Sequence, residues 1–227
     1  MLKQYINIKT HNLNFLQHTS LYNLPTHLKV GIYGGSFNPP HKGQLYIAEQ
    51  AIKRLDLNVL LWLVTPLNPL KTKATFSLQD RVLLSKELTK FNYKIKVSSF
   101  EDSFSQYYSY FTLEKLKQLS SNNSLTWIMG EDNLANFHHF VSWQSILSNN
   151  NIAVFARNEF SYSSLLQKAS FVYKRNQIGY FNNEGEVKQP LGKKTWLKFF
   201  LLPKNKMSST LIRQQVLKKG YNTKKTY

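Results

Sequence analysis

A chain of 227 residues with 42% hydrophobic residues is long enough to bury the core of one globular domain, and it contains no cysteine. Disulfides, thiolate metal sites and cysteine nucleophiles are therefore excluded, and a reducing, cytoplasmic location is expected. The formal net charge of +18 favours anionic partners such as nucleotides, nucleic acid or an acidic membrane, although biased composition would also account for it. Because no apolar run reaches the roughly 18 residues of a membrane span, no membrane partner is expected.

The beginning of the chain is interpreted as an extension. Residues 1–28 lack a continuous apolar run, and we expect them to be poorly structured or partly docked on the rest of the protein. Residues 29–220 are predicted to form a single domain, and residues 221–227 a basic tail. The lysines are otherwise scattered and no base-stacking motif accompanies them, so nucleic acid is not expected as the main partner.

The first strand and helix of this domain are separated by the segment GGSFNPPHKGQ, residues 34–44. Residues 30–33 have high β-propensity, and apolar residues recur at helical spacing from Leu45 to Leu55. We expect Gly34 and Gly35 to allow a sharp reversal and a close backbone approach, and the helix to begin close to His41 because proline cannot lie inside it. A helix N-terminus after a glycine turn favours an anion such as phosphate, and His41 adds a titratable donor. The glycines alone fit a plain strand-to-helix junction equally well.

The same order of strand and helix continues along the chain. Strands are predicted at 60–64, 95–97, 125–129, 152–156 and 199–202, with helices after Ser77, over 112–119, around 143–147 and after Ser208–Thr210. Ser77 and Asp80 have the spacing of a capping box, and the helix behind them carries Val82, Leu83, Leu84 and Leu88. Residues 171–190 fit either a hairpin or an irregular excursion. The alternation predicts an α/β fold with a doubly wound parallel sheet.

Polar segments follow several of these strands. They are the glycine turn, Thr65 to Asn68, Gly130 to Asn133 and Ser208 to Thr210. Ligands of doubly wound sheets bind beyond the carboxyl ends of the strands. We therefore expect all four segments to lie on one edge of the sheet.

Four segments together carry a resemblance to a known family. GGSFNPPHKGQ resembles the G-G-[ST]-F-[DN]-P-x-H-x-G-H signature of the nucleotidyltransferase superfamily. With LWLVTPLNPLK at 60–71, WIMGEDNLANFHHFVSW at 127–143 and MSSTLIR at 207–213, the chain resembles bacterial nicotinate-nucleotide adenylyltransferases, particularly the alphaproteobacterial form. The resemblance covers the chain from Lys29 to about Gly220. It implies a Rossmann-like nucleotidyltransferase fold and a late reaction of NAD biosynthesis. In that reaction ATP and nicotinate mononucleotide give nicotinate adenine dinucleotide and pyrophosphate, with Mg²⁺ carried by the ATP phosphates.

The resemblance also implies roles for individual residues. The implied ATP-binding residues are Gly34, Gly35, Ser36, Phe37, His41, Gln44, Gly130, Asp132, Ser209, Thr210 and Arg213. Catalytic roles are implied for His41, at the α-phosphate, and for Gln44 and Arg213. The implied acceptor-binding residues are Thr65, Asn68, Lys71, Thr112 and Phe140. No direct protein ligand to the metal is expected. Ser208–Thr210 could instead be a simple helix cap, and Lys71 a solvated lysine.

Three positions depart from the family pattern. Ser109 replaces the first threonine of the family's T-Y-x-T-L segment. Gln44 stands where the family has a second histidine, so a group that can be cationic is replaced by a neutral amide. Phe140 stands where the family has a tryptophan. These changes keep two alternatives open: a degenerate member that binds nucleotide with little catalysis, or a related nucleotidyltransferase that acts on another phosphate monoester. The choice between nicotinate and nicotinamide mononucleotide, and the oligomeric state, are not fixed by the sequence.

Overall fold

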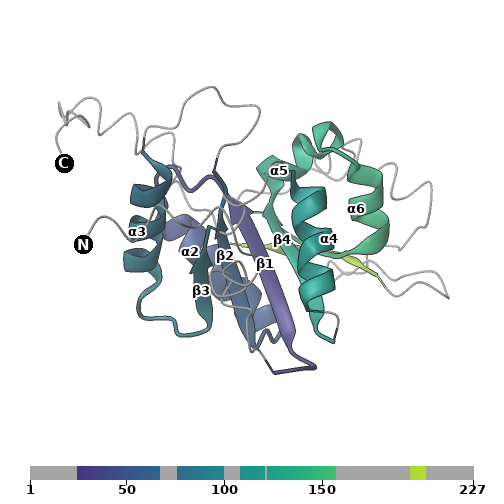
Figure 1. Ribbon diagram of the computed structural model, residues 1–227, viewed down its shortest axis with the longest axis horizontal. Helices are drawn as coiled ribbons and strands as arrows, with labels where there is room; N and C mark the ends of the chain where they lie inside the picture. The colour runs from purple at the N-terminus through teal and green to yellow at the C-terminus, as the bar shows by residue number, and fades with distance from the viewer. Residues whose placement is uncertain (1–24, 67–75, 100–107, 121, 157–194, 203–227) are drawn as a thin grey trace, which may run out of the picture.

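A six-stranded parallel sheet forms the centre of the molecule (Figure 1). The computed structural model describes residues 25–66, 76–99, 108–120, 122–156 and 195–202. The strands are β1 (Lys29–Gly35), β2 (Val59–Val64), β3 (Ile95–Ser98), β4 (Ser124–Gly130), β5 (Asn151–Ala156) and β6 (Leu197–Leu201). Their order is β3-β2-β1-β4-β5-β6, and all neighbouring pairs are parallel. This order is that of doubly wound nucleotide-binding sheets, so the predicted fold class is confirmed.

Helices cover both faces of the sheet. They are α2 (Lys42–Arg54), α3 (Leu78–Thr89), α4 (Ser109–Leu119), α5 (Glu131–Ala135), the 3-10 helix η3 (Phe137–His139) and α6 (Trp143–Asn149). The apolar side chains of α2 and α3 form one core with the sheet, and those of α4, η3 and α6 form the other. Strand β2 is buried at every residue because alternate side chains enter the two cores. Its continuous apolar run therefore follows from burial on two faces.

Helix α3 begins as its sequence predicts but turns a different face inward. Ser77 Oγ accepts a hydrogen bond from Asp80 N at 3.1 Å, and Asp80 Oδ2 accepts one from Ser77 N at 3.3 Å. This capping box was expected from the spacing. The side chains of Leu83 and Leu84, however, are 63% and 41% exposed, whereas Arg81 is 1% exposed. Part of the apolar content of α3 therefore faces outward, and a cation faces the sheet.

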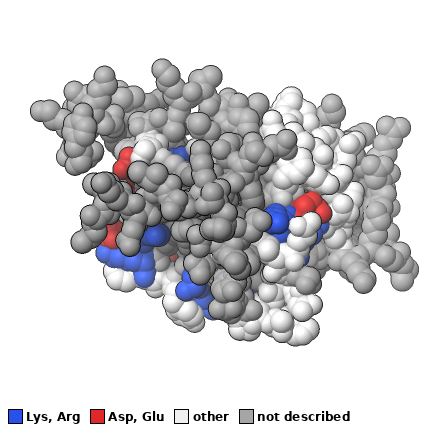
Figure 2. Space-filling view, viewed as in Figure 1, with Lys and Arg blue, Asp and Glu red and all other residues white. Residues whose placement is uncertain are grey.

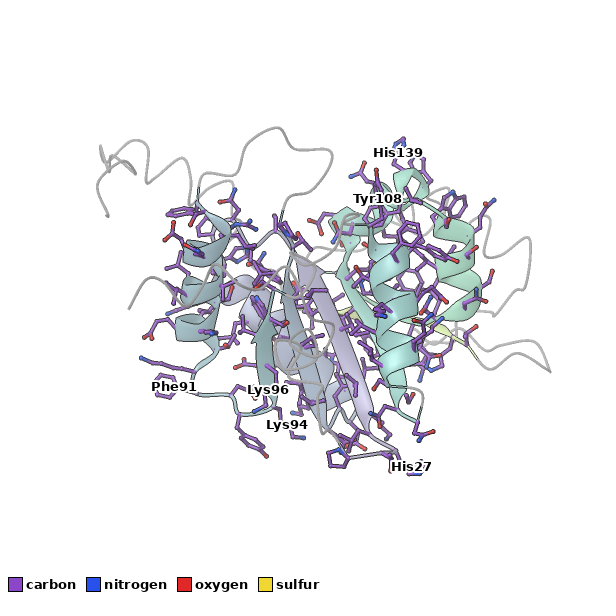
Figure 3. All side chains as sticks on the ribbon, viewed as in Figure 1. His27, Phe91, Lys94, Lys96, Tyr108 and His139 are labelled. Carbon is purple, nitrogen blue, oxygen red and sulfur yellow. The ribbon has the colours of Figure 1, made fainter. Side chains whose placement is uncertain are left out.

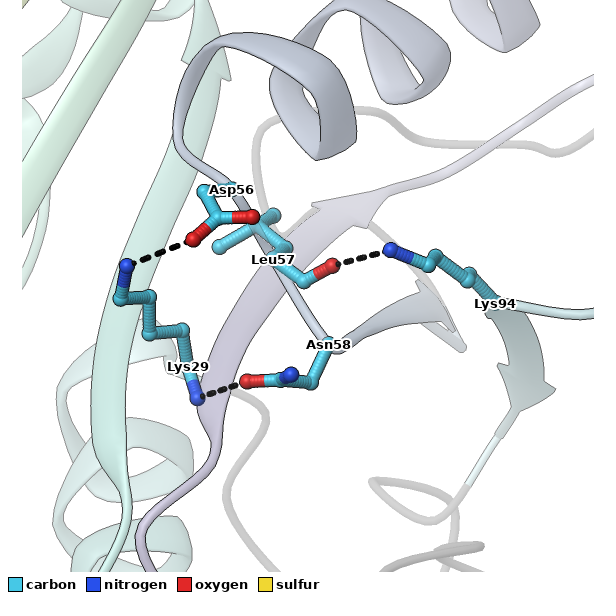
Figure 4. Close-up of polar contacts among 5 residues, drawn as sticks. All are labelled: Lys29, Asp56, Leu57, Asn58 and Lys94. Carbon is cyan, nitrogen blue, oxygen red and sulfur yellow. Dashed lines mark hydrogen bonds and ion pairs between the residues drawn. The ribbon is translucent and has the colours of Figure 1, made fainter.

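The amino edge of the sheet is held by exposed polar contacts (Figure 4). Lys29 Nζ lies 2.9 Å from Asp56 Oδ2, Lys29 N donates to Asn58 Oδ1 at 2.8 Å, and Lys94 Nζ donates to Leu57 O at 3.0 Å. The hydrogen bond and positive charge of Lys29 lower the pKa of the Asp56 carboxyl. These contacts join the starts of β1 and β3 to the turn before β2. In Figure 3, Lys94 and Lys96 mark this edge and Tyr108 and His139 mark the opposite edge.

Several expectations fall outside the described residues. These are residues 1–24, the segment 171–190, the helix after Ser208–Thr210 and the tail at 221–227. Residues 25–28, assigned above to the extension, are described: His27 N donates to Asn122 O at 2.9 Å and Leu28 N to Asn123 Oδ1 at 2.8 Å. Within the described ranges, no helix has the length and apolar character needed to cross a membrane. Figure 2 shows Lys and Arg in separate groups on the face in view.

Candidate active site

In the turn after β1 the left-handed residue is Phe37, so the predicted reversal does not lie at the two glycines. Gly34 and Gly35 are the last residues of β1, and neither has a left-handed backbone. Phe37 has a φ of 41°, in the left-handed region that side chains other than glycine rarely adopt. Its ring is 1% exposed and stacks on Trp62, with ring centroids 4.2 Å apart. Burial of the Phe37 ring against β2 therefore helps to hold a strained turn.

The two glycines of the turn have different surroundings. A Cβ at Gly35 would lie 3.2 Å from the ring of Phe37, so glycine allows that ring to pack beneath the strand end. A Cβ at Gly34 would meet no atom of the described residues within 4 Å. Nothing among those residues therefore requires glycine at position 34. The open space leaves the strand end accessible to a ligand, as a phosphate-binding turn requires.

The N-cap of helix α2 is His41, so the helix begins where the sequence predicts. The first turn contains an unusual capping box. His41 is the N-cap, with φ −150° and ψ 163°, and is 4% exposed. Gln44, the third residue of the helix, accepts a hydrogen bond from His41 N through Oε1 at 3.1 Å. Because that backbone N–H needs an acceptor, the contact fixes which end of the Gln44 amide faces the backbone. The NH₂ group of Gln44 is turned to the other side, where it can donate.

No acidic residue lies in the first turn of α2. The positive end of the helix dipole is therefore not compensated by a carboxylate within its own first turn. The helix is 13 residues long and begins directly after the turn. Its first N–H groups and the buried imidazole of His41 together suit an anionic group such as a phosphate.

Arg81 is a site residue that sequence reasoning missed. Its guanidinium donates from Nη1 to Ser36 O and to Thr65 O, both at 2.7 Å, and from Nη2 to Pro66 O at 2.5 Å. Burial lowers the pKa of the Arg81 guanidinium, which remains charged near neutral pH because the pKa of arginine starts so high. No motif in the sequence marked Arg81, because its partners come from two distant loops.

A second contact joins α3 to the glycine turn. Asn38 Oδ1 accepts a hydrogen bond from Phe76 N at 3.1 Å, just before the Ser77 cap of α3. The Asn38 side chain is 8% exposed, and the peptide bond from Asn38 to Pro39 is cis. The segment SFNPP therefore contacts Arg81 of α3 through Ser36, and the residue before the α3 cap through Asn38.

At the end of β4, Gly130 and Asp132 lie close together. Gly130 is the last residue of β4 and the N-cap of α5. A Cβ at Gly130 would lie 2.5 Å from Asp132 Oδ1, so glycine leaves room for this exposed carboxylate over the strand end. The exposed carboxylate oxygens of Asp132 can accept hydrogen bonds from a group with hydroxyl donors.

The three predicted acceptor residues that the structure describes differ in their burial and in their contacts. Thr65 N donates to Gly35 O at 3.0 Å, so Thr65 lies directly beside the glycine turn. Thr112 is 2% exposed in the first turn of α4, with its Oγ1 3.4 Å from Tyr108 O. The ring of Phe140 packs against the core, 5.3 Å from Phe137 and 6.0 Å from Trp127 between centroids.

The sheet brings most described candidates to one edge. Because β1 lies between β2 and β4, its glycine turn is flanked by Thr65 on one side and by Gly130 on the other. His41, Gln44 and Arg81 lie at the helix starts on this same edge. The predicted clustering is therefore confirmed for three of the four segments. Asn68, Lys71, Ser209, Thr210 and Arg213 lie outside the described residues.

Comparisons with known proteins extend over most of the chain. The family model described as cytidylyltransferase-like matches residues 32–215. A protein of Ruegeria sp. (strain TM1040), named "Probable nicotinate-nucleotide adenylyltransferase", is 34% identical over 188 residues, which cover 83% of this chain and 97% of the relative. A protein of Brucella suis with the same name is 37% identical over 200 residues, which cover 87% of this chain and 100% of the relative.

Solved structures share the fold. The Plasmodium falciparum nicotinic acid mononucleotide adenylyltransferase complexed with APC has a TM-score of 0.61 to this chain, with 15% identity and 83% of each chain covered. The structure of that protein complexed with NaAD has a TM-score of 0.58, with 16% identity and the same coverage. At these identities the likeness establishes the fold alone.

Proposed function

The chain belongs to the cytidylyltransferase-like nucleotidyltransferases and, within them, to the nicotinate-nucleotide adenylyltransferase family, and from this we propose that it transfers the adenylyl group of ATP to nicotinate mononucleotide. The products would be nicotinate adenine dinucleotide and pyrophosphate, as in NAD biosynthesis. The observation that carries the proposal is the start of α2: buried His41, a first turn without acidic residues, and open space at Gly34. This arrangement suits a triphosphate.

The reaction needs no protein nucleophile. A phosphate oxygen of nicotinate mononucleotide attacks the α-phosphorus of ATP in line, and the bond from that phosphorus to the pyrophosphate oxygen breaks. Catalysis then depends on positioning the two phosphates and on stabilising the charge that develops on their oxygens. We assign His41 as the donor to the α-phosphate. Ser209, Thr210 and Arg213 are assigned to the β- and γ-phosphates by resemblance.

Gln44 is proposed to act in both helix capping and catalysis. Its Oε1 accepts from His41 N, which supports the proposal that its NH₂ group donates to a phosphate oxygen. A histidine at this position could donate too, and could also carry a positive charge. We therefore expect Gln44→His to raise the rate if the lost charge limits catalysis in the native protein.

The remaining assignments complete the two substrate sites. Gly130 and Asp132 would receive the adenosine ribose, whose hydroxyls can donate to the carboxylate. Thr65, Asn68, Lys71, Thr112 and Phe140 are proposed for the mononucleotide. Mg²⁺ would enter with ATP and be held by phosphates and water. A cytoplasmic location remains part of the proposal.

The test is pyrophosphate release by the purified protein with ATP and Mg²⁺, comparing nicotinate mononucleotide, nicotinamide mononucleotide and no acceptor. Release that depends on nicotinate mononucleotide supports the proposal. Release with both mononucleotides would make the enzyme unselective between acid and amide. Folded protein that binds ATP but releases nothing with either, even as Gln44→His, would instead be a nucleotide-binding member without catalysis. Release only with another phosphate monoester would change the substrate.

A further inference from the structure

The buried guanidinium of Arg81 connects the two loops that the proposed function assigns to different substrates. Ser36, in the glycine turn, belongs to the ATP side. Thr65 and Pro66, after β2, belong to the acceptor side. All three carbonyl oxygens accept from this one side chain, at 2.5 to 2.7 Å. Arginine suits this position because its planar fork presents several donors in fixed directions, which the single ammonium of lysine cannot do.

In the part of the chain that the structure describes, the side-chain hydrogen bonds of Arg81 go to these two loops. None of the ion pairs among the described residues includes Arg81, and its buried Nε has no hydrogen-bond partner among them. Among the described residues, its charge is therefore stabilised by the dipoles of carbonyl groups. A buried cation held in this way is costly unless its partners stay in place. The three carbonyl groups hold the guanidinium of Arg81 in place, and the guanidinium in turn holds the two loops together.

The contact with Ser36 also determines how the next peptide group points. The carbonyl of Ser36 and the N–H of Phe37 belong to one trans peptide unit, so they point in opposite directions. With the carbonyl held by Arg81, the Phe37 N–H is directed away from the guanidinium. Phe37 is the residue with the left-handed backbone, stacked on Trp62. Loss of the Arg81 contact would allow this strained turn to relax.

We propose that Arg81 is a positioning residue of the active site, which holds the glycine turn and the loop after β2 in the relative arrangement that brings the two substrates together. It need not touch either substrate. The inference rests on the proposed function for the identity of the two substrates. The contacts of Arg81 are observed independently of that function. A group that positions both loops should affect both substrates when it is removed. A residue that touches only one substrate should affect mainly that one.

The experiment compares Arg81→Met and Arg81→Lys with a matched surface control, Arg54→Met. Arg54 is exposed in the last turn of α2 and bonds Gln50. We expect both Arg81 variants to raise KM for ATP and for nicotinate mononucleotide together and to lower kcat. The loss in kcat/KM should be about 10²-fold for Met, the effect expected of a small misplacement of reacting groups. Arg81→Lys should lose less, because it keeps the charge.

Melting curves separate positioning from folding. Every variant is assayed well below its own midpoint, so that folded protein alone is compared. Arg81→Met leaves three carbonyl oxygens without their donor and should lower the melting midpoint. Either Arg81 variant that folds is sufficient for the test. The proposal is overturned if a folded Arg81 variant keeps the native kcat/KM, or if only one of the two KM values changes. It is also overturned if neither variant folds at any temperature, since Arg81 would then be needed for folding itself.

A binding measurement distinguishes failure of this proposal from failure of the proposed function. Calorimetry with a non-hydrolysable ATP analogue requires no turnover. We expect about tenfold or greater weakening in Arg81→Met and native affinity in Arg54→Met. If the native protein binds the analogue but has no transferase activity, the proposed function fails while the role of Arg81 in the turn is still measured. Native affinity in Arg81→Met would overturn the role of Arg81.

Discussion

Two neighbouring helices, α2 and α3, begin with capping boxes built from different residues. The box of α3 pairs Ser77 with Asp80, is exposed, and places a carboxylate in the first turn. The box of α2 pairs His41 with Gln44, is largely buried, and has no carboxylate. Serine and aspartate are good capping residues, whereas histidine is not among those preferred at an N-cap. The residues of the α2 box are better explained by chemistry at the glycine turn than by helix stability.

The comparison predicts that substitutions in the α3 box change mainly stability, whereas substitutions in the α2 box change mainly activity. At α3, the N–H groups are satisfied by the protein, and a change there should affect folding. At α2, a carboxylate would compete with a bound phosphate for the positive end of the helix. Substitutions that stabilise the start of α2 should therefore lower the catalytic activity of the protein.

The largest effect is expected for His41→Asn. Asparagine is among the best N-cap residues, so we expect stability to change by no more than about 1 kcal/mol. Activity should fall by about 10² to 10³ in kcat, the cost of removing one donor to a developing oxyanion. Steady-state pyrophosphate release and thermal melting measure the two quantities. Native kcat would show that His41 serves only as a cap.

The next largest effect is expected for Gln44→Glu. The carboxylate keeps an acceptor for His41 N and adds a favourable charge at the helix start, worth about 0.3–1 kcal/mol of stability. Repulsion of a phosphate a few ångströms away should cost about 10² in kcat/KM, given about 3 kcal/mol at 5 Å and an effective dielectric constant of 20. Gln118→Glu, exposed near the end of α4, makes the same charge change far from the site and should leave kcat/KM unchanged. A full-activity Gln44→Glu would exclude phosphate contact there.

A smaller effect is expected for alanine substitutions at two glycines of β1, one of which should change stability and the other nucleotide affinity. A Cβ at Gly31 would lie 2.5 Å from Leu57 Cδ1 and 2.8 Å from Ile128 Cδ1, so Gly31→Ala should cost about 1–3 kcal/mol of stability by overpacking. Gly34→Ala enters open space and should leave stability unchanged or slightly raised. It should weaken binding of the ATP analogue, measured by calorimetry, because its methyl group occupies the space at the strand end. Unchanged affinity would place the nucleotide elsewhere.

The smallest effect is expected for Ser77→Ala. Loss of the Ser77 cap should destabilise the protein by about 1 kcal/mol, which lowers Tm by roughly 2–4 °C in a protein of this size. Folded Ser77→Ala should keep native kcat/KM. A large loss of activity without a change in melting would show that the two boxes do not differ in function.

Local sequence was enough to determine most elements of this protein. The apolar run of β2, the Ser77 and Asp80 spacing and the prolines before His41 each act within a few residues, so their structural meaning can be read directly. The alternation of strands and helices then limited the topology, because parallel strands require crossovers and place all carboxyl ends on one edge. Thr65 and Gly130 could thus be assigned to the edge of the glycine turn.

The tertiary structure alone decided how the turn is held. Periodicity suggested nothing about Arg81, because the carbonyls of Ser36, Thr65 and Pro66 lie 45, 16 and 15 residues from it in the chain. The left-handed backbone of Phe37 likewise depends on stacking with Trp62, a residue of another strand. A buried cation and a strained turn are each unfavourable by themselves and persist only where distant groups surround them. The sequence could therefore indicate where the site lies but not what supports it.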